Sequence, residues 1–249
     1  MYSQALKNKV VLVTGAARSI GAEMCDYFEG VGAKVVRTDI DDAARNVRHL
    51  DVTNEAEWKS VVADVVKTHG RIDGLVNNAA VIFMAGPFWE ETNEQFARML
   101  DVNVMGTWLG LQTVTRAMAK TGGGSVVNFS STSGVMAAAP FTGYGTTRWA
   151  VRGLTKHVAM GLASKKIRVN SLHPHGIADS AMVEMFSPPG PKREVERFRK
   201  QQAKNNPLGR LGTYDDVSAM VTFLLSDDST WITGREFVVD GGATLATSQ

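Results

Sequence analysis

The sequence has little of what marks several classes of protein. Cys25 is its only cysteine, which excludes an intrachain disulfide and a cluster of thiolate metal ligands. Cys25 lies among apolar residues with no histidine beside it, so we expect a buried side chain and not a nucleophile. The formal net charge is only +2 over 249 residues, too small to indicate a nucleic-acid or membrane partner.

Long hydrophobic runs are also missing. The longest, such as residues 10–13, have the length of a strand and cannot span a bilayer. Residues 1–9 are polar and mixed, without the apolar core of a secretory signal. We therefore expect a cytoplasmic protein without a metal. Basic residues do gather in 192–200, but glutamates alternate with them, which favours a solvated helix face over a phosphate site.

What is present is an alternation of short β-rich runs with longer helical patterns. The predicted strands are 10–13, 34–38, 47–50, 74–76, 125–129, 168–171 and 236–239. The predicted helices are roughly 20–31, 54–69, 93–119, 144–163 and 215–225. Strands that are continuously apolar are typical of a parallel sheet covered on both faces. The fold class is therefore α/β: a single Rossmann-type doubly wound domain over 1–249, with a parallel sheet of about seven strands.

Two details refine this organisation. Asn54 is a plausible N-cap, and Trp58 recurs with valines at helical spacing, which favours core over a ligand platform. Between 176 and 210 no strand is predicted, and Pro188, Pro189 and Pro191 interrupt the segment. Such a stretch is either a substrate lid or an irregular pair of surface helices.

The first turn carries a phosphate-binding pattern. TGAARSIG, residues 14–21, joins a strand to a helix, and glycines there let backbone N–H groups approach a pyrophosphate. The alternative is a tight corner. Asp39 ends the second strand, where a carboxylate can accept hydrogen bonds from an adenosine ribose and repel a 2′-phosphate. Arg18 has the opposite tendency, since a guanidinium can pair with that phosphate.

A second constellation comprises Ser131, Tyr144 and Arg148. Tyr144 and Arg148 are four apart near the start of a helix, on one face. A cation favours the phenolate, which acid/base catalysis by a tyrosine needs. Ser131 ends a strand, where its hydroxyl can hold a substrate oxygen. The alternative is a structural contact at the helix start and an ordinary strand-end turn.

From Lys7 to Gly242 the sequence resembles the short-chain dehydrogenase/reductase family. The resemblance is carried by TGAARSIG (14–21), LDVT (50–53), LVNNAA (75–80), DVNVMGTW (101–108), SVVNFSSTSG (125–134), YGTTRWAVRGLTK (144–156), IRVNSLHP (167–174) and VDGG (239–242). Within the family, the tyrosine motif is most similar to bacterial hydroxysteroid dehydrogenases of the 3α/20β type.

The resemblance implies roles for individual positions. It implies that Asn103, Ser131, Tyr144 and Arg148 are catalytic, with Asn103 holding a water in a proton relay. It implies an NAD site, NADP being less favoured, that is formed by Gly15, Arg18, Ser19, Ile20, Gly21, Asp39, Asp51, Val52, Asn78, Ala79, Tyr144, Arg148, Pro174, Gly176, Ile177 and Ser180. The family further implies a homotetramer.

Three departures from the family stand out. Arg148 occupies the position of the usual lysine and cannot lose its proton, so a relay through a neutral lysine is closed to it. Ser19 replaces the usual middle glycine of the turn. His175 is an additional residue where the family usually has Pro-Gly, and it lies in or just outside the nicotinamide pocket. His175 is either structural or catalytic.

Two hypotheses follow. One is an enzyme that interconverts a hydrophobic, cyclic or steroid-like secondary alcohol with its ketone. Its substrate pocket would have an apolar wall that comprises Phe83, Met84, Met136, Phe141, Met182, Met185 and Phe186. The alternative is that these residues belong to the ordinary hydrophobic core. The other is a nucleotide-binding regulator that has lost turnover. Arg148 and Ser19 favour this hypothesis, whereas the intact Asn103, Ser131 and Tyr144 argue against it.

Overall fold

Seven parallel strands form one sheet in the order β3-β2-β1-β4-β5-β6-β7. The computed structural model describes residues 4–44, 46–83, 87–180, 183, 185, 192–204 and 206–245. The strands are β1 (Val10–Thr14), β2 (Lys34–Asp39), β3 (Val47–His49), β4 (Gly74–Asn77), β5 (Gly124–Phe129), β6 (Ile167–Pro174) and β7 (Glu236–Val239). All the predicted strands are confirmed. The chain leaves β1 toward β2 and β3 and then returns to β4, which places a topological switch point between β1 and β4.

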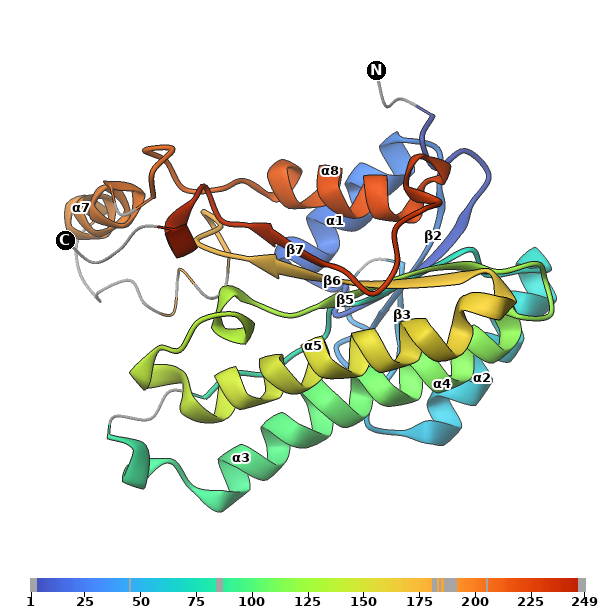
Figure 1. The fold of residues 1–249 in the computed structure, drawn as a ribbon, viewed down its shortest axis with the longest axis horizontal. Coiled ribbons are helices and arrows are strands. Elements are labelled where there is room, and N and C mark those ends of the chain that lie inside the picture. Colours follow the sequence, from blue (N-terminus) through green and yellow to red (C-terminus); the bar gives the residue numbers. More distant parts are fainter. Residues whose placement is uncertain are drawn as a thin grey trace.

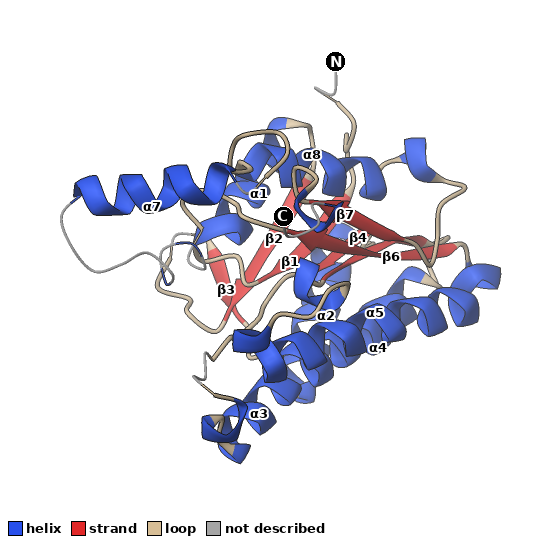
Figure 2. Ribbon diagram, turned by 60° about the vertical axis from the view of Figure 1, so that its left-hand side comes forward, coloured by secondary structure: helices blue, strands red, loops and turns tan. Residues whose placement is uncertain are grey.

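Helices cover both faces of the sheet, as expected. They are α1 (Ser19–Gly30), α2 (Glu55–His69), α3 (Asn93–Met99), α4 (Gly106–Met118), α5 (Thr142–Leu162), α7 (Lys192–Lys204) and α8 (Tyr214–Leu225). Helices α1 and α8 lie on one face and α2, α4 and α5 on the other, whereas α7 projects at one end (Figures 1 and 2). Among the described residues, no helix has the length and apolar character needed to cross a membrane.

Successive side chains of each strand point to opposite faces of the sheet and contribute to two hydrophobic cores, one on each face. Val10 and Leu12 of β1 pack with Trp58 on the α2/α4/α5 face, whereas Val11 and Val13 pack on the α1/α8 face. Trp58 is fully buried, as expected, and its indole N–H donates to the carbonyl of Val52 at 2.9 Å. Both faces of the sheet are therefore sealed, which leaves the strand ends as the places for chemistry.

Cys25 is buried on the α1/α8 face. Burial is the main cause that raises the pKa of its thiol, to about 12. A thiol with this pKa is protonated at neutral pH, so it is a poor nucleophile. The interpretation of Cys25 as a packing residue is confirmed.

One predicted helix is interrupted. The stretch 93–119 divides into α3, a π-helical segment Leu100–Met105 and α4. A π-helical turn accommodates an extra residue within a helix and occurs frequently at functional sites. Asn103 lies within this segment and is fully buried.

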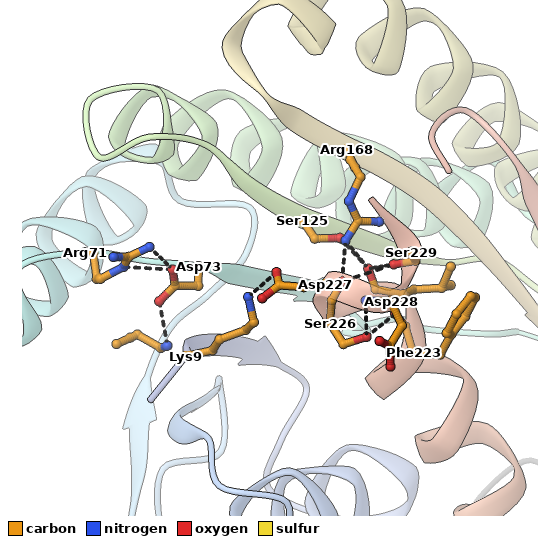
Figure 3. Close-up of polar contacts among 12 residues, drawn as sticks. Lys9, Arg71, Asp73, Ser125, Arg168, Phe223, Ser226, Asp227, Asp228 and Ser229 are labelled. Atoms are coloured by element: carbon orange, nitrogen blue, oxygen red, sulfur yellow. Dashed lines mark hydrogen bonds and ion pairs between the residues drawn. The ribbon is translucent and has the colours of Figure 1, made fainter. Parts of the chain in front are cut away.

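The amino ends of the strands carry structural polar contacts (Figure 3). The guanidinium of Arg168, at the start of β6, donates to the carbonyls of Leu224 at 2.7 Å, Ser226 at 3.0 Å and Ile232 at 3.4 Å. The contacts with Leu224 and Ser226 satisfy carbonyls at the end of α8 that have no partner within the helix. Asp73 similarly accepts the N–H of Val10 at 2.9 Å. The polar contacts at the amino ends of the strands therefore stabilise the fold.

Candidate active site

A cavity of about 790 Å³ lies at the carboxyl ends of the strands. Its lining comes from segments that follow β1, β2, β3, β4, β5 and β6, so it spans the topological switch point, where ligands bind in open α/β sheets. Of the residues implied by the family resemblance, the lining includes Gly15, Arg18, Ser19, Ile20, Asp39, Asp51, Val52, Asn78, Ala79, Ser131, Tyr144, Arg148, Pro174, Gly176, Ile177 and Ser180.

The turn between β1 and α1 forms one wall of this cavity. Gly15 adopts φ +67, and a Cβ there would lie 2.8 Å from the Cα of Ala79, so the turn demands glycine. Ser19, at the first position of α1, has φ +52, a left-handed conformation that costs most residues about 1–2 kcal/mol. This conformation explains why the family favours glycine at this position. The hydroxyl of Ser19 lies 3.4 Å from that of Tyr214.

Gly21 does not line the cavity. A Cβ at Gly21 would lie 1.9 Å from the carbonyl oxygen of Gly15, so its role in this structure is to let α1 pack against the turn. Asn78, which directly follows β4, fixes the same turn, since its side-chain amide donates to the carbonyls of Thr14 and Gly15, both at 3.0 Å. Asn78 therefore shapes the turn and also contributes to the cavity wall.

Two carboxylates lie at the β2–β3 side of the cavity. Asp39 accepts the N–H of Ala17 at 3.0 Å through one oxygen and that of Asp41 at 3.0 Å through the other. Each oxygen keeps a lone pair for a ligand hydroxyl. Partial burial raises the pKa of Asp51, but hydrogen bonds from Thr53 outweigh it, and the pKa is lowered overall. Arg98, which the sequence interpretation did not single out, also lines this side and lowers that pKa further.

Ser131 lies beyond the end of β5. Its hydroxyl oxygen accepts the N–H of Ser133 at 3.1 Å, which holds the side chain at the cap of a short 3-10 helix, Thr132–Gly134. Its carbonyl accepts Nδ1–H of His173 at 2.9 Å, and Nε2 of His173 lies 2.9 Å from the Ser171 hydroxyl. Burial lowers the pKa of His173, so a neutral imidazole braces the Ser131 backbone.

Tyr144 and Arg148 are neighbours on α5, one turn apart. The guanidinium carbon of Arg148 lies 4.6 Å from the centre of the Tyr144 ring, a cation–π distance. Nη1 of Arg148 donates to the carbonyl of Phe129 at 3.0 Å. Both side chains line the cavity although little of either is exposed. The predicted juxtaposition of the phenol with a cation is present.

Arg148 has an unusual surrounding for a buried cation. Its Nε is buried and has no hydrogen-bond partner. Within the described residues, no carboxylate lies within ion-pair distance of Arg148. A buried polar atom without a partner is costly and is typical of a site that a ligand completes. This open donor capacity beside Tyr144 fits the hydroxyl-rich ribose of a dinucleotide.

Asn103 lies beneath the cavity rather than in its wall. Its side chain accepts the N–H of Val81 at 2.9 Å and donates to the Val81 carbonyl at 2.9 Å and to Thr147 at 3.1 Å. Its own carbonyl accepts the hydroxyl of Thr107 at 2.8 Å. The structure therefore shows Asn103 tying the π-helical segment to the cavity floor. The relay role implied by the family stays a prediction.

The segment after β6 closes the far side of the cavity. The N–H of His175 donates to the carbonyl of Val239 at 3.1 Å, and its Nδ1 lies 3.1 Å from the Thr132 hydroxyl. His175 lines the cavity, so it lies within the predicted pocket and not outside it. The Ser180 hydroxyl donates to the carbonyl of Ile177 at 2.7 Å and accepts the N–H of Val183 at 3.3 Å.

The predicted apolar wall is present in part. Met136, Phe141 and Met185 line the cavity, whereas Phe83 does not. Met84, Met182 and Phe186 lie outside the described residues. Further lining residues that the sequence interpretation missed are Ile40, Ile82, Arg98, Thr132, Val183, Phe198, Gln202 and Leu211. The basic stretch 192–200 was interpreted as a solvated helix face, and no sequence signal indicates that Phe198 and Gln202 of α7 reach the cavity.

Comparison with known proteins agrees with this geometry. Residues 15–244 match the family model described as Enoyl-(Acyl carrier protein) reductase. The 3-alpha-(or 20-beta)-hydroxysteroid dehydrogenase of Mycobacterium bovis is 38% identical over 249 residues, covering 95% of this chain and 90% of the relative. The cyclopentanol dehydrogenase of Comamonas sp. is 35% identical over 253 residues, covering 96% and 98%.

A solved structure extends the match to three dimensions. The ligand-free aldohexose dehydrogenase of Thermoplasma acidophilum is 30% identical and superposes with a TM-score of 0.91, covering 100% of this chain and 98% of the other. The named relatives are dehydrogenases, and none supports the alternative of a regulator. The chain therefore belongs to the short-chain dehydrogenase/reductase family and is an oxidoreductase that uses a nicotinamide cofactor to act on a CH–OH group.

Proposed function

We propose that this protein is an NAD-dependent oxidoreductase that interconverts a hydrophobic, cyclic or steroid-like secondary alcohol with its ketone. The observation that carries the proposal is the continuous cavity, which joins Asp39 and Asp51 on one side of the switch point to Ser131 and Tyr144 on the other. A bound nicotinamide cofactor supplies or accepts the hydride. The residues of the chain bind the cofactor and the substrate and transfer the proton to or from the substrate oxygen.

Tyr144 is the proposed acid/base group. In ketone reduction its hydroxyl donates a proton to the substrate oxygen, and in alcohol oxidation its phenolate accepts one. The Ser131 hydroxyl, whose oxygen is held by Ser133, donates a hydrogen bond to the same oxygen. Arg148, whose guanidinium lies over the Tyr144 ring, stabilises the phenolate by its charge. The buried Nε of Arg148 is the donor we assign to the cofactor ribose.

The proton route differs from that of a lysine-containing relative. Arg148 is charged at every ordinary pH, so it positions the ribose and the phenolate without exchanging protons. The carbonyl of Asn103 already accepts the Thr107 hydroxyl, although its second lone pair can still hold a water. We assign Asn103 that predicted water.

The preference for NAD rests on the carboxylate at the end of β2. Asp39 is held by two backbone N–H groups with its oxygens still able to accept from a ribose diol. A 2′-phosphate at this point would meet like charge. Arg18 and Arg98 also line this side and would favour that phosphate. We expect Asp39 to prevail because its carboxylate is fixed in position.

The substrate class rests on the apolar residues of the cavity wall. Met136, Phe141, Met185 and Phe198 present apolar surface to the cavity. Such a wall suits a cyclic hydrocarbon frame better than a sugar. Among the relatives, a steroid and a cyclopentanol dehydrogenase match this preference, whereas the aldohexose dehydrogenase takes a sugar.

Three further parts of the proposal concern the whole protein. We propose that residues 176–210 form a lid, supported by Phe198 and Gln202 in the cavity wall and by the ion pair of Arg199 with Asp179 at 2.7 Å. We also propose a homotetramer and a cytoplasmic location. The lid is the part that would control which alcohol enters.

Cofactor preference tests the proposal with NADH and NADPH and a panel of cyclic ketones, steroids and sugars. We expect kcat/KM to be at least about ten-fold higher with NADH, equal to about 1.4 kcal/mol of differential binding. Asp39→Ala should reduce the ratio of kcat/KM with NADH to kcat/KM with NADPH. Asp41→Ala is a control, because this exposed neighbour is not part of the cavity wall. A clear NADPH preference, or turnover of sugars alone, would overturn the proposal.

A further inference from the structure

One polar pair in the cavity has no part in the proposed reaction. Nδ1 of His175 lies 3.1 Å from the hydroxyl of Thr132, and both residues line the cavity. The two come from segments that follow different strands, β6 and β5. Their contact therefore spans the end of the sheet beside the reacting groups.

The pair is held firmly in place. The N–H of His175 is bonded to β7 through the carbonyl of Val239 at 3.1 Å. Thr132 is buried and begins the short 3-10 helix that Ser131 caps. Because Thr132 directly follows Ser131, the pair lies in the reacting half of the cavity. Asp39 and Asp51 belong to the other half, beyond β1 in the strand order.

The imidazole is uncharged and keeps one nitrogen for a ligand. Burial lowers the pKa of His175 more than the nearby Asp240 raises it, so the ring is neutral at neutral pH. Among the described residues, Nε2 of His175 has no hydrogen-bond partner, and this atom is not fully buried. A ligand in the cavity can therefore reach it.

The chemistry of that ligand group follows from this setting. With Nδ1 engaged by a hydroxyl, Nε2 either donates or accepts, depending on the tautomer. A hydroxyl group satisfies both tautomers, and a carbonyl satisfies one. A carboxylate is disfavoured because the ring carries no charge and Asp240 lies near it. The matching group is an uncharged oxygen function.

We propose that His175, oriented by Thr132, selects substrates that carry a second hydroxyl or carbonyl oxygen on an otherwise apolar frame. The inference rests on the proposed function, because the first oxygen is the one held by Ser131 and Tyr144. Apolar residues of the wall support selection, because Met136, Met185 and Leu211 also line the cavity and offer no hydrogen bond. A substrate without a second oxygen leaves the imidazole unpartnered once water is excluded, which weakens its binding.

The test compares kcat/KM for cyclohexanol and its diols with NAD in four proteins. The variants are His175→Phe, which keeps a ring of similar size, Thr132→Val, which removes one hydroxyl, and the control His157→Phe at an exposed position of α5. The wild type and the control should prefer at least one diol about ten-fold, the effect of one good hydrogen bond. His175→Phe should lose this preference while cyclohexanol is oxidised as before or faster, and Thr132→Val should lose part of it.

Two results would overturn the inference. One is a wild type that shows no preference for any diol. The other is a His175→Phe enzyme that loses both kinds of substrate equally while it melts normally, which would make the residue structural. If His175→Phe does not fold, Thr132→Val decides alone. Absence of all turnover in the wild type would contradict the proposed function instead, and calorimetric binding of the same alcohols to the NAD complex would still decide the role of His175.

Discussion

At the scale of single residues, Arg148 shows how a site can oppose stability. The guanidinium is buried, donates to one backbone carbonyl and stacks on Tyr144, but Nε has no partner. A buried charge without a paired anion is costly to the fold. The sequence predicted that Arg148 faces Tyr144, because a spacing of four residues fixes a shared helix face. It could not predict the Phe129 carbonyl, which β5 supplies from elsewhere in the chain.

Replacing Arg148 by methionine should therefore separate stability from catalysis. Methionine fills similar space without charge, so Arg148→Met should raise the free energy of unfolding by about 1 to 3 kcal/mol. Alcohol oxidation should become slower, since the phenolate loses its neighbouring cation. Arg148→Lys should restore the rate. Chemical denaturation and kcat/KM for alcohol oxidation measure the two effects.

Arg152 provides the matched control one turn further along α5. It stacks on Trp149 at 4.6 Å and pairs with Glu236 at 2.7 Å, so its charge is compensated. Arg152→Met should not raise stability and should leave kcat/KM for alcohol oxidation unchanged. If Arg148→Met keeps the wild-type kcat/KM, the cation does not act on the phenolate and its assigned role is wrong.

At the scale of elements, caps were predictable and interruptions were not. Asn54 caps α2 as predicted, accepting the N–H groups of Ala56 at 3.0 Å and Glu57 at 3.3 Å, because an Asn before an apolar helical pattern carries its own signal. The π-helical segment Leu100–Met105 interrupts a pattern that remains helical in sequence. The sequence carries no signal for this interruption, which is seen only in the structure around Asn103. The Thr132–His175 contact was likewise invisible, because it joins two loops.

The end of α8 supplies a stability prediction at this scale. Arg168→Met should lower the free energy of unfolding by roughly 2 kcal/mol, because three carbonyls lose a charged donor. Burial lowers the pKa of Arg168 but leaves it protonated at neutral pH, so these bonds persist across the ordinary pH range. Cofactor affinity should not change, since the site is at the opposite edge of the sheet. Thermal melting and NADH titration measure both, with exposed Arg116→Met as control.

An effect on the free energy of unfolding no larger than that of Arg116→Met would show that water replaces the guanidinium at the end of α8. An altered NADH affinity would show that the two edges of the sheet are coupled.

At the scale of the whole molecule, the order of the sheet determines where the site lies. The alternating pattern predicted the strands and the doubly wound class, and hence a site at the carboxyl ends. The pattern left 176–210 open between a lid and surface helices, because the contacts of Phe198 and Gln202 depend on how α7 is placed. The outer surface also carries information that the sequence alone did not. Met105 at the end of the π-helical segment, Trp108 on α4, and Trp149 and Met160 on α5 are all exposed, at 50%, 47%, 47% and 83%.

These four side chains predict how copies of the chain associate. Helices α4 and α5 run side by side (Figure 1), so an exposed apolar surface on both is suited to a second copy. Sedimentation should show an oligomer for the wild type and a smaller species for the double variant Trp108→Lys/Trp149→Lys. Trp89→Lys, at a more exposed position on the short 3-10 helix Phe88–Glu90 and outside α4 and α5, should not change the mass. A wild type that sediments as a monomer would contradict the proposed tetramer.

The most direct test of the account follows the hydride and the proton together. NADH that carries deuterium at the reactive nicotinamide carbon is incubated with a cyclic ketone, and the alcohol product is analysed for deuterium at the carbinol carbon. The wild type should transfer the label, and Tyr144→Phe should transfer it about 10² to 10⁴ times more slowly while binding NADH normally. The control Tyr27→Phe, on α1 and outside the cavity wall, should behave as the wild type. Transfer by Tyr144→Phe at the wild-type rate, or no transfer by the wild type to any ketone, would contradict the account.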